Sequence, residues 1–423
     1  MALKERIKGL IAKAETTYAT DPTVALTDTI ETVGLEIQPY VGENLDLEQD
    51  RASLGASGQV PVGEEVTMNF GVYAVGAGAA ATKPGFAALL ESCGLKGGAD
   101  EKVAIWTNSG NETSGGYKTN DGQLYKAKNN HTRADANEPG TNGGNSVWEK
   151  GDMTKNQASK QFDGFAYKQK MFIYTEANNT LRYFRCIKDH TDGSTTRPPI
   201  GNTDGGRSWK ENWQQVKAGY SFHPISAEIP SLWMEATLDG QKHISKGSRG
   251  NLALEFQSRT LPRMNYSFRG LYATPTTVVT PEFDYSKFLT PQGVTNRNTP
   301  NANLHGIDVI MNQLSLDFGN QLEHIDDVNL ESIDLNQREV SGSIVIEMPK
   351  ISTRNWFTTI RSLSEGPLLL EHGDTAGKGF QIYGPSTTLG SPTVTNVQGR
   401  FMLEIPLRFV PVSQNDDVIL TTF

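Results

Sequence analysis

The chain of 423 residues has only two cysteines, Cys93 and Cys186, and no apolar run long enough to cross a membrane. Two distant cysteines exclude a disulfide framework, a four-thiolate zinc site and a paired redox motif, so we expect both to be buried packing residues. The net charge of −9 lacks the basic excess that general binding to nucleic-acid phosphates requires. The first residues contain no secretion signal, which predicts an intracellular product without a membrane anchor.

Motifs of metal, cofactor and covalent chemistry are also missing. The seven histidines show no ligand spacing, and there is no phosphate-binding loop or nucleophile elbow. Gly76-Ala-Gly78 follows an expected strand, as in dinucleotide-binding turns, but the helix after it starts only near Pro84 and no acidic residue ends a second strand. Asp326-Asp327 and Glu331 are typical of a solvated acidic loop. The sequence predicts no metal, no cofactor and no enzymatic activity.

The abundant glycine and proline and the alternating apolar residues indicate strands and turns. The chain has 42 Gly and 20 Pro, and residues 66–75 alternate apolar and polar side chains as in a strand with two distinct faces. Residues 232–238 followed by Asp239-Gly240 predict a hairpin. Further strands are expected over 251–256 and 264–270, and a short helix over 84–93. The predicted fold class is therefore mainly β with short flanking helices.

The N-terminal segment, residues 1–29, carries a different pattern. Leu3, Ile7, Leu10, Ile11 and Ala14 recur at helical spacing, with Lys and Arg between them. The spacing predicts a short amphipathic helix. It either packs on its own domain or serves as an arm that docks on a neighbouring subunit.

The second half of the chain repeats the order of elements of the first half at low residue identity. The matching segments are 35–48 with 314–325, 65–73 with 339–347, the helix 84–93 with a helix over 353–363, 251–256 with 379–383, and 264–270 with 400–409. This predicts a duplicated β-sandwich. The first domain comprises 30–100 and 218–272, a Thr-, Pro- and Asn-rich linker spans 273–304, and the second domain spans 305–423.

Residues 101–217 differ in composition from the rest and are predicted to be an inserted unit. They hold 17 Lys and Arg against 13 Asp and Glu, or +4, which leaves 22 against 35, or −13, for the remainder. Within them, 125–132 aligns with 184–191 at an offset of 59 residues, and Trp148 aligns with Trp209. The insert is expected to be a tandem of small β modules over 101–150 and 165–217.

Aromatic residues of the insert suggest a sugar-binding surface, because the apolar face of a pyranose packs on a flat aromatic ring. Core packing of the same rings is the alternative, since small β modules need large apolar side chains. The candidate carbohydrate-binding residues are Tyr117, Tyr125, Trp148, Tyr183, Trp209 and Trp213.

Outside the insert, the chain resembles the major tail tube proteins of long-tailed (siphovirus-like) bacteriophages. The resemblance is carried by the strings at 45–51, 53–55, 75–82, 86–94, 238–243, 246–250 and 269–272. It implies a β-sandwich with a long hairpin, whose copies stack as rings with a continuous β-barrel around a DNA channel. The implied partners are further copies of the chain, the tape measure, tail terminator and distal tail proteins, and phage DNA that passes without specific binding. The implied location is a virion tail assembled in the host cytoplasm.

The insert resembles the small chitin-binding-type modules of bacterial chitinases. Asp121-Gly-Gln-Leu-Tyr-Lys-Ala127, Glu138-Pro-Gly140 and Trp148 carry this resemblance. The second copy, residues 179–186, lacks the glycine of the first. The resemblance implies an external decorating module that binds host-surface glycans.

Three expectations follow for a tail tube. DNA must slide past the wall, so carboxylates such as Glu48, Glu64, Glu65 and Glu347 are expected to line the lumen. Two tube domains per chain predict trimeric rings with pseudo-six-fold symmetry rather than hexamers. The insert should project outward and be dispensable for assembly.

The alternative function is a carbohydrate-binding surface protein on a β scaffold. A glycan-active enzyme ranks third, because the sequence offers no convincing pair of catalytic carboxylates on facing strands.

Overall fold

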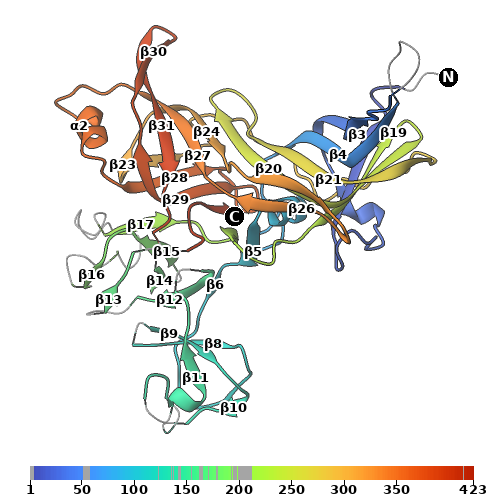
Figure 1. Cartoon of the computed structure of the whole chain (residues 1–423). Helices are drawn as coiled ribbons and strands as arrows, with labels where there is room; N and C mark the ends of the chain where they lie inside the picture. The colour runs from blue at the N-terminus through green and yellow to red at the C-terminus, as the bar shows by residue number, and fades with distance from the viewer. Residues whose placement is uncertain are drawn as a thin grey trace.

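The computed structural model is mainly β, as the sequence predicts (Figure 1). The structure describes residues 4–50, 58–121, 123–134, 136, 138–141, 144–153, 155–161, 165–169, 171–177, 180–191, 193, 198, 212–412 and 414–423.

A large antiparallel sheet forms the first layer and contains strands from both halves of the chain. In order across this sheet the strands are β3 (Val33–Asp46), β4 (Gln59–Tyr73), β21 (Arg263–Thr277), β20 (Gln241–Gln257), β24 (Met311–Asp317), β27 (Ser341–Glu347), β31 (Arg400–Phe409) and β30 (Thr393–Val397). In the part of the chain that the structure describes, this sheet does not close into a barrel, since β3 and β30 each have one partner strand.

A second set of strands covers one face of this sheet. Its strands are β5 (Leu95–Ala99), β18 (Tyr220–Pro224), β32 (Ile419–Thr422), β29 (Phe380–Leu389), β28 (Gly366–His372), β22 (Asn301–Leu304) and β23 (Ile307–Asp308). Beside them lie β2 (Thr29–Ile30), β1 (Lys8–Ala14) and β19 (Leu232–Leu238). Strand β20 joins the layers because its first half pairs with β19 and its second half with β24.

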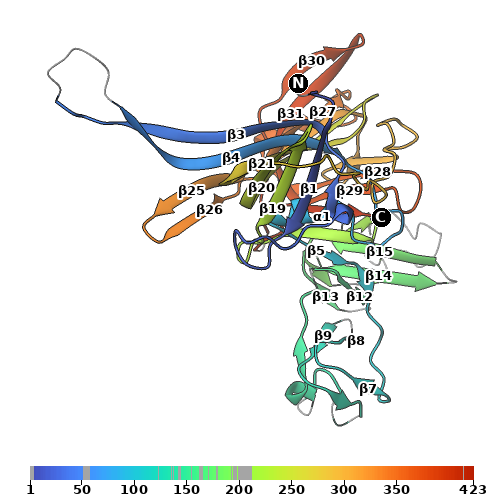
Figure 2. The ribbon, with the colours of Figure 1, turned by 90° about the vertical axis from the view of Figure 1, so that its right-hand side faces the viewer.

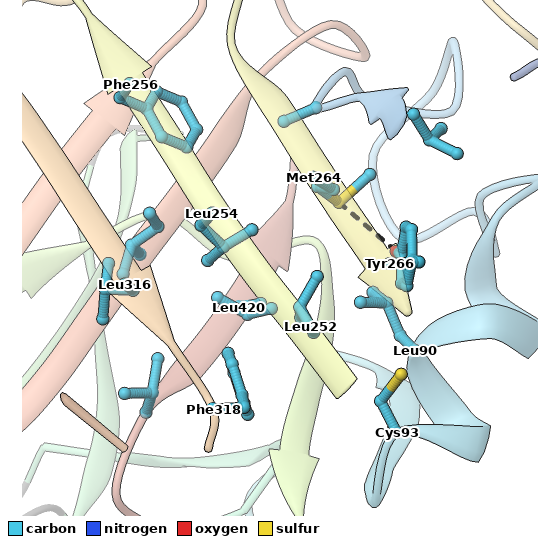
Figure 3. Close-up of a cluster of buried hydrophobic side chains, with 14 of the residues drawn as sticks. Leu90, Cys93, Leu252, Leu254, Phe256, Met264, Tyr266, Leu316, Phe318 and Leu420 are labelled. Atoms are coloured by element: carbon cyan, nitrogen blue, oxygen red, sulfur yellow. Dashed lines mark hydrogen bonds between the residues drawn. The ribbon is translucent and has the colours of Figure 1, made fainter. Parts of the chain in front are cut away.

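The hydrophobic core lies between the two layers. Leu254 of β20 and Leu316 of β24 point toward Leu420 of β32 (Figure 3). The alternation expected over 66–75 is confirmed, since Met68 and Phe70 are buried while Asn69 between them is partly exposed. Each such side chain contributes about 1.5–3 kcal/mol when fully buried.

The two helices predicted over 84–93 and 353–363 are present and shorter than expected. Helix α1 (Ala87–Ser92) buries Leu89 and Leu90 against the core, and Gly94 follows it with a φ of 84° that suits glycine. Helix α2 (Trp356–Arg361) begins after Asn355, whose side chain accepts a hydrogen bond from the Thr358 amide.

The predicted N-terminal helix is wrong. Residues Lys8–Ala14 form β1, which pairs with β19 along one edge and with β2 along the other. Leu10, Ile11 and Ala12 are all buried, because the strand is covered on both faces. A continuous apolar run of this kind matches a helical pattern by spacing alone, and the partner strand β19 lies more than 200 residues away in the sequence.

The hairpin at Asp239-Gly240 is confirmed. Both residues have positive φ, 41° and 90°, and Leu238 lies opposite Gln241. The strand expected over 379–383 exists as β29, but it lies in the second layer. The hairpin partner of β31 is β30, so the segment matched to 251–256 was misassigned.

Two hairpins project from the same side of the molecule (Figure 2). The longer is formed by β3 and β4, and the shorter by β25 (Gln321–Asp327) and β26 (Leu330–Gln337). The expected linker 273–304 is partly strand, because β21 extends to Thr277 and β22 begins at Asn301.

The insert contains two small β modules. The first has β7 (Asn111–Glu112), β8 (Tyr117–Asn120), β9 (Gln123–Ala127), β10 (His131–Thr132) and β11 (Trp148–Lys150). The second has β6 (Glu101–Lys102), β12 (Gln157–Lys160), β13 (Ala166–Tyr167), β14 (Phe172–Ala177), β15 (Thr180–Cys186), β16 (His190–Thr191) and β17 (Trp213–Val216).

The modules repeat, but the predicted tryptophan match is wrong. Trp148 lies opposite Ala127, and Trp213 lies opposite Cys186, which is the residue 59 positions after Ala127. Trp213 therefore occupies the place of Trp148, and Trp209 lies outside the described residues. A histidine packs edge-on against each tryptophan ring, at 4.9 Å between centroids in the first module and 5.1 Å in the second.

Candidate functional surfaces

The first candidate surface is the face of the large sheet that points away from the core, called here the polar face. Its side chains alternate with core residues along each strand. They include Glu36 and Gln38 of β3, Glu65, Thr67 and Asn69 of β4, Arg263, Asn265, Ser267 and Arg269 of β21, Arg249, Asn251, Glu255 and Gln257 of β20, Gln313, Ser315 and Asp317 of β24, Ser341 and Ser343 of β27, and Glu404 and Arg408 of β31.

Short hydrogen-bonded side chains dominate the centre of the polar face. The Asn251 amide donates to Asp317 at 2.8 Å, and the Ser315 and Ser343 hydroxyls lie 3.0 Å apart. The Asn320 backbone amide donates to the Asn251 side chain at 2.9 Å. These contacts cross β20, β24 and β27, so they bind the two halves of the chain together. Sequence reasoning missed these residues, although the strand alternation could have identified them as the positions between core residues.

The four predicted lumen carboxylates do not come together. Glu48 is exposed after the end of β3, and Glu64 on β4 accepts a hydrogen bond from the Tyr40 hydroxyl at 3.2 Å. Glu347, at the end of β27, forms an exposed ion pair with Arg400 at 2.9 Å.

Glu65 lies on the polar face by its register with β21, but its carboxylate is buried and paired. Arg269 donates to both of its oxygens, with the shortest contact at 2.8 Å, and Arg269 also donates to the Leu322 carbonyl. His324 of β25 lies 3.9 Å from the same carboxylate. Glu65 therefore fastens the β25–β26 hairpin to the sheet and offers no free charge to a channel.

The second candidate surface is the pair of sheet edges, β3 and β30. Among the described residues each pairs with a neighbour on one side only. The side chain of Val394 on β30 is 52% exposed, although its alternation places it on the core side of the sheet. On β3, Lys8 Nζ donates to the Leu35 carbonyl at 2.9 Å, so this carbonyl points away from β4. Open edges of this kind are templates for pairing with another chain.

The third candidate surface is a cleft of about 480 Å³ in the first module. Its lining includes Asn120, Asp121, Gln123, Tyr125, Glu138, Pro139, Gly140 and Lys150. The Asn120 amide holds the two stretches together by donating to Glu138 at 3.0 Å and to the Pro139 carbonyl at 2.9 Å. A Cβ at Gly140 would lie 2.6 Å from the Tyr125 hydroxyl, so glycine is required there. The two halves of the chitin-binding-type string thus meet at one polar cleft.

The described residues of the predicted aromatic platform do not form one surface. Trp148 and Trp213 are 2% and 1% exposed, so they are core residues and offer no ring face to a sugar. Tyr117 packs against the core of the second module, and Tyr183 stacks on Phe172 with ring centroids 5.5 Å apart. Of the candidate aromatic residues that the structure describes, Tyr125 is the one that lines the cleft, although it is only 9% exposed and packs with Trp148 in a buried cluster. The alternative of core packing is therefore correct for Trp148 and Trp213, and Trp209 lies outside the described residues.

The second module is fixed to the main body by apolar packing. Phe172, Tyr174 and Val216 form one buried cluster with side chains of the second half. The body contributes Leu369 of β28, Tyr383 of β29 and Ile419 of β32.

A buried polar network lies where the insert joins the body. The Asp100 carboxylate accepts hydrogen bonds from the Ser221 hydroxyl at 2.6 Å, the Gly219 amide at 3.0 Å and the Asn156 amide at 3.0 Å. Burial raises the pKa of Asp100, while these hydrogen bonds oppose the rise. Ser221 also contacts the Thr421 hydroxyl at 2.7 Å, so the network joins the insert to β32.

In the part of the chain that the structure describes, no group of three or more His, Cys, Asp or Glu side chains is placed to hold a metal ion. None of the described helices has the length and apolar character needed to cross a membrane. In comparison with known proteins, the chain matches no family model and no curated protein.

Proposed function

We propose that this chain is a non-enzymatic structural subunit of a phage-type tail tube, located in the virion tail and assembled in the host cytoplasm. The observation that carries the proposal is the order of strands in the large sheet. Strands β3, β4, β21 and β20 follow one another in the first half, and β24, β27, β31 and β30 follow in the second. In both halves a hairpin of two late strands packs beside two early ones, which supports a duplicated tube domain.

The two proposed units join edge to edge through β20 and β24. Repeating the same edge contact between chains would extend the sheet until it closes into a barrel. Three chains would supply six four-stranded units. At about 4.8 Å per strand, such a barrel has a backbone diameter of about 37 Å before strand tilt widens it. A lumen of this size accommodates a DNA duplex.

The polar face suits the wall of such a lumen. Its centre carries short Ser, Asn and Thr side chains, and its charges have both signs. DNA phosphates would find no basic track to bind, so the duplex can slide. The proposed partners are further copies of this chain, the tape measure, tail terminator and distal tail proteins, and phage DNA in transit.

Negative-stain microscopy and native mass spectrometry of the purified protein test the proposal together. The expected result is rings or tubes built from three chains per ring. Six chains per ring would contradict the duplicated domain, and a monodisperse monomer at high concentration would contradict the tube itself.

A second function, glycan binding by the first module, is favoured by the cleft at Tyr125. Its size lies within the range of small-ligand sites, and amides, carboxylates and Lys150 can satisfy sugar hydroxyls. On an assembled tail many weak sites would act together. The test is retention of the protein on chitin or host polysaccharide. Lys150→Ala removes an exposed side chain that lines the cleft and should weaken retention, whereas Lys160→Ala, at an exposed position of the second module, should not.

A further inference from the structure

We propose that copies of this chain join by pairing β30 of one chain with β3 of the next, in the register that β20 and β24 show inside one chain. This inference rests on the proposed tube function, because it requires assembly. The internal contact pairs Ala253 with Asp317, Leu254 with Leu316, Glu255 with Ser315, Phe256 with Leu314, and Gln257 with Gln313. The residues of β30 and β3 that correspond to these can be found through the strands that both halves share.

The first correspondence aligns the inner strands. In the first half, Val72 of β4 lies opposite Met264 of β21, and both are buried. In the second half, Ile346 of β27 lies opposite Leu403 of β31, and both are buried. The alignment of 65–73 with 339–347 places Val72 at Ile346, so we take these two pairs as equivalent in the two units.

The second correspondence carries this alignment to the outer edge of each unit. Met264 also lies opposite Leu254 of β20. Leu403 also lies opposite Val394 of β30. Val394 is therefore the second-half counterpart of Leu254.

The third correspondence aligns the opposite edges. Met68 of β4 lies opposite Ile37 of β3. Met68 precedes Val72 by four residues, and Gly342 of β27 precedes Ile346 by four residues, so Gly342 corresponds to Met68. Gly342 lies opposite Leu316 of β24. Ile37 is therefore the first-half counterpart of Leu316.

The internal pair Leu254 and Leu316 thus predicts that Val394 lies opposite Ile37 of the next copy. Their neighbours follow, with Thr395 opposite Glu36 and Thr393 opposite Gln38. Because the two strands run antiparallel, each pair lies on one face of the sheet.

The chemistry of the edges fits this register. Val394 is 52% exposed in the single chain, whereas its counterpart Leu254 is 1% exposed. Ile37 is half-buried and packs against the core, so pairing would cover both side chains with each other. Thr395 and Glu36 would lie on the polar face, as Glu255 and Ser315 do. The Leu35 carbonyl, held by Lys8 in the single chain, would be released to the partner strand.

The contact joins two different edges, so it is head-to-tail, and its repetition closes a ring or continues as a helix. The internal pairing of β20 with β24 shows the strand geometry that each step of this repetition would use.

Disulfide trapping tests the register. Glu36→Cys combined with Thr395→Cys places thiols on the polar face at the two edges of one sheet. Within one chain the edges are seven strand spacings, or about 34 Å, apart, so any bond between these thiols must join two copies. The two natural cysteines are buried and should not interfere. The matched control is Asn44→Cys with Thr395→Cys, because Asn44 lies on β3 eight residues beyond Glu36.

The expected result is a ladder of covalent multimers on oxidation of the Glu36→Cys, Thr395→Cys protein and monomers from the control. Rings that form but cross-link through the control pair, or through neither pair, would overturn the register and leave the proposed tube intact. Failure of the unsubstituted protein to form rings would overturn both proposals. If the first pair prevents assembly, Ile37→Cys with Val394→Cys tests the same register from the core side.

Discussion

At the scale of single residues, the ion pair between Glu65 and Arg269 connects strands β4 and β21 of the body to the β25–β26 hairpin. We expect Glu65→Ala to lower the free energy of unfolding by about 2–3 kcal/mol, because it leaves a partly buried guanidinium without its partner. Urea titration of the unassembled protein measures this loss. Glu347→Ala breaks an exposed pair and should cost less than about 1 kcal/mol. Equal costs for the two variants would contradict the anchoring role.

Buried histidines predict sensitivity to mild acid. Burial and the nearby charges of Arg185 and Lys155 lower the pKa of His223 well below 6.5, and burial also lowers the pKa of His243, His305 and His372. Below pH 6.5 these histidines are protonated in the unfolded chain but remain neutral in the folded chain, so the free energy of unfolding falls as the pH decreases.

The measurement is the free energy of unfolding between pH 7 and pH 5. His223→Gln removes one titrating group and should reduce the slope by up to about 1.4 kcal/mol per pH unit. An unchanged slope in this variant would show that His223 is accessible to protons in the folded state.

At the scale of elements, the sequence correctly predicts strands that have one buried face and one polar face. The prediction is wrong for a strand that is buried on both faces. The alternation at 66–75 identified β4 because one face contacts the core and the other is polar. The run at Lys8–Ala14 was misjudged because β1 is covered on both sides, and only its distant partner strands show this. The cleft at Tyr125 was partly predictable, since the string that lines it was recognised. The burial of Trp148 and Trp213 could not be predicted, because a tryptophan side chain suits a core and a sugar-binding surface equally well.

The edge strand β30 provides a direct test of assembly. Val394→Lys places a charge on the core side of an open edge. The single chain should fold as before, because Val394 is half exposed, but rings should not form. Circular dichroism checks the fold, and sedimentation velocity checks assembly. Val279→Lys is the matched control at a position 89% exposed outside the edge strands, and it should assemble. Rings from the Val394→Lys protein would exclude this edge from the contact.

At the scale of the whole molecule, the insert divides into a part that is integrated into the body and a part that is not. The second module buries Leu369, Tyr383 and Ile419 of the body and shares the Asp100 network with β18 and β32. The first module contacts mainly the second, through Leu124 and Tyr117. The expectation that all of 101–217 is dispensable therefore applies, on physical grounds, to the first module alone.

Two deletions separate these parts. Replacing residues 104–152 by a short Gly-Ser linker removes the cleft and the first module, and the protein should still fold and form rings while losing retention on polysaccharide. Removing 101–217 exposes three large apolar side chains, each worth about 1.5–3 kcal/mol when buried, and takes the Asn156 amide away from the buried Asp100 carboxylate. That protein should unfold at lower urea concentration or aggregate. If it instead forms normal tubes, the second module is an appendage like the first, and its apolar contact with β28, β29 and β32 contributes little to the stability of the wall.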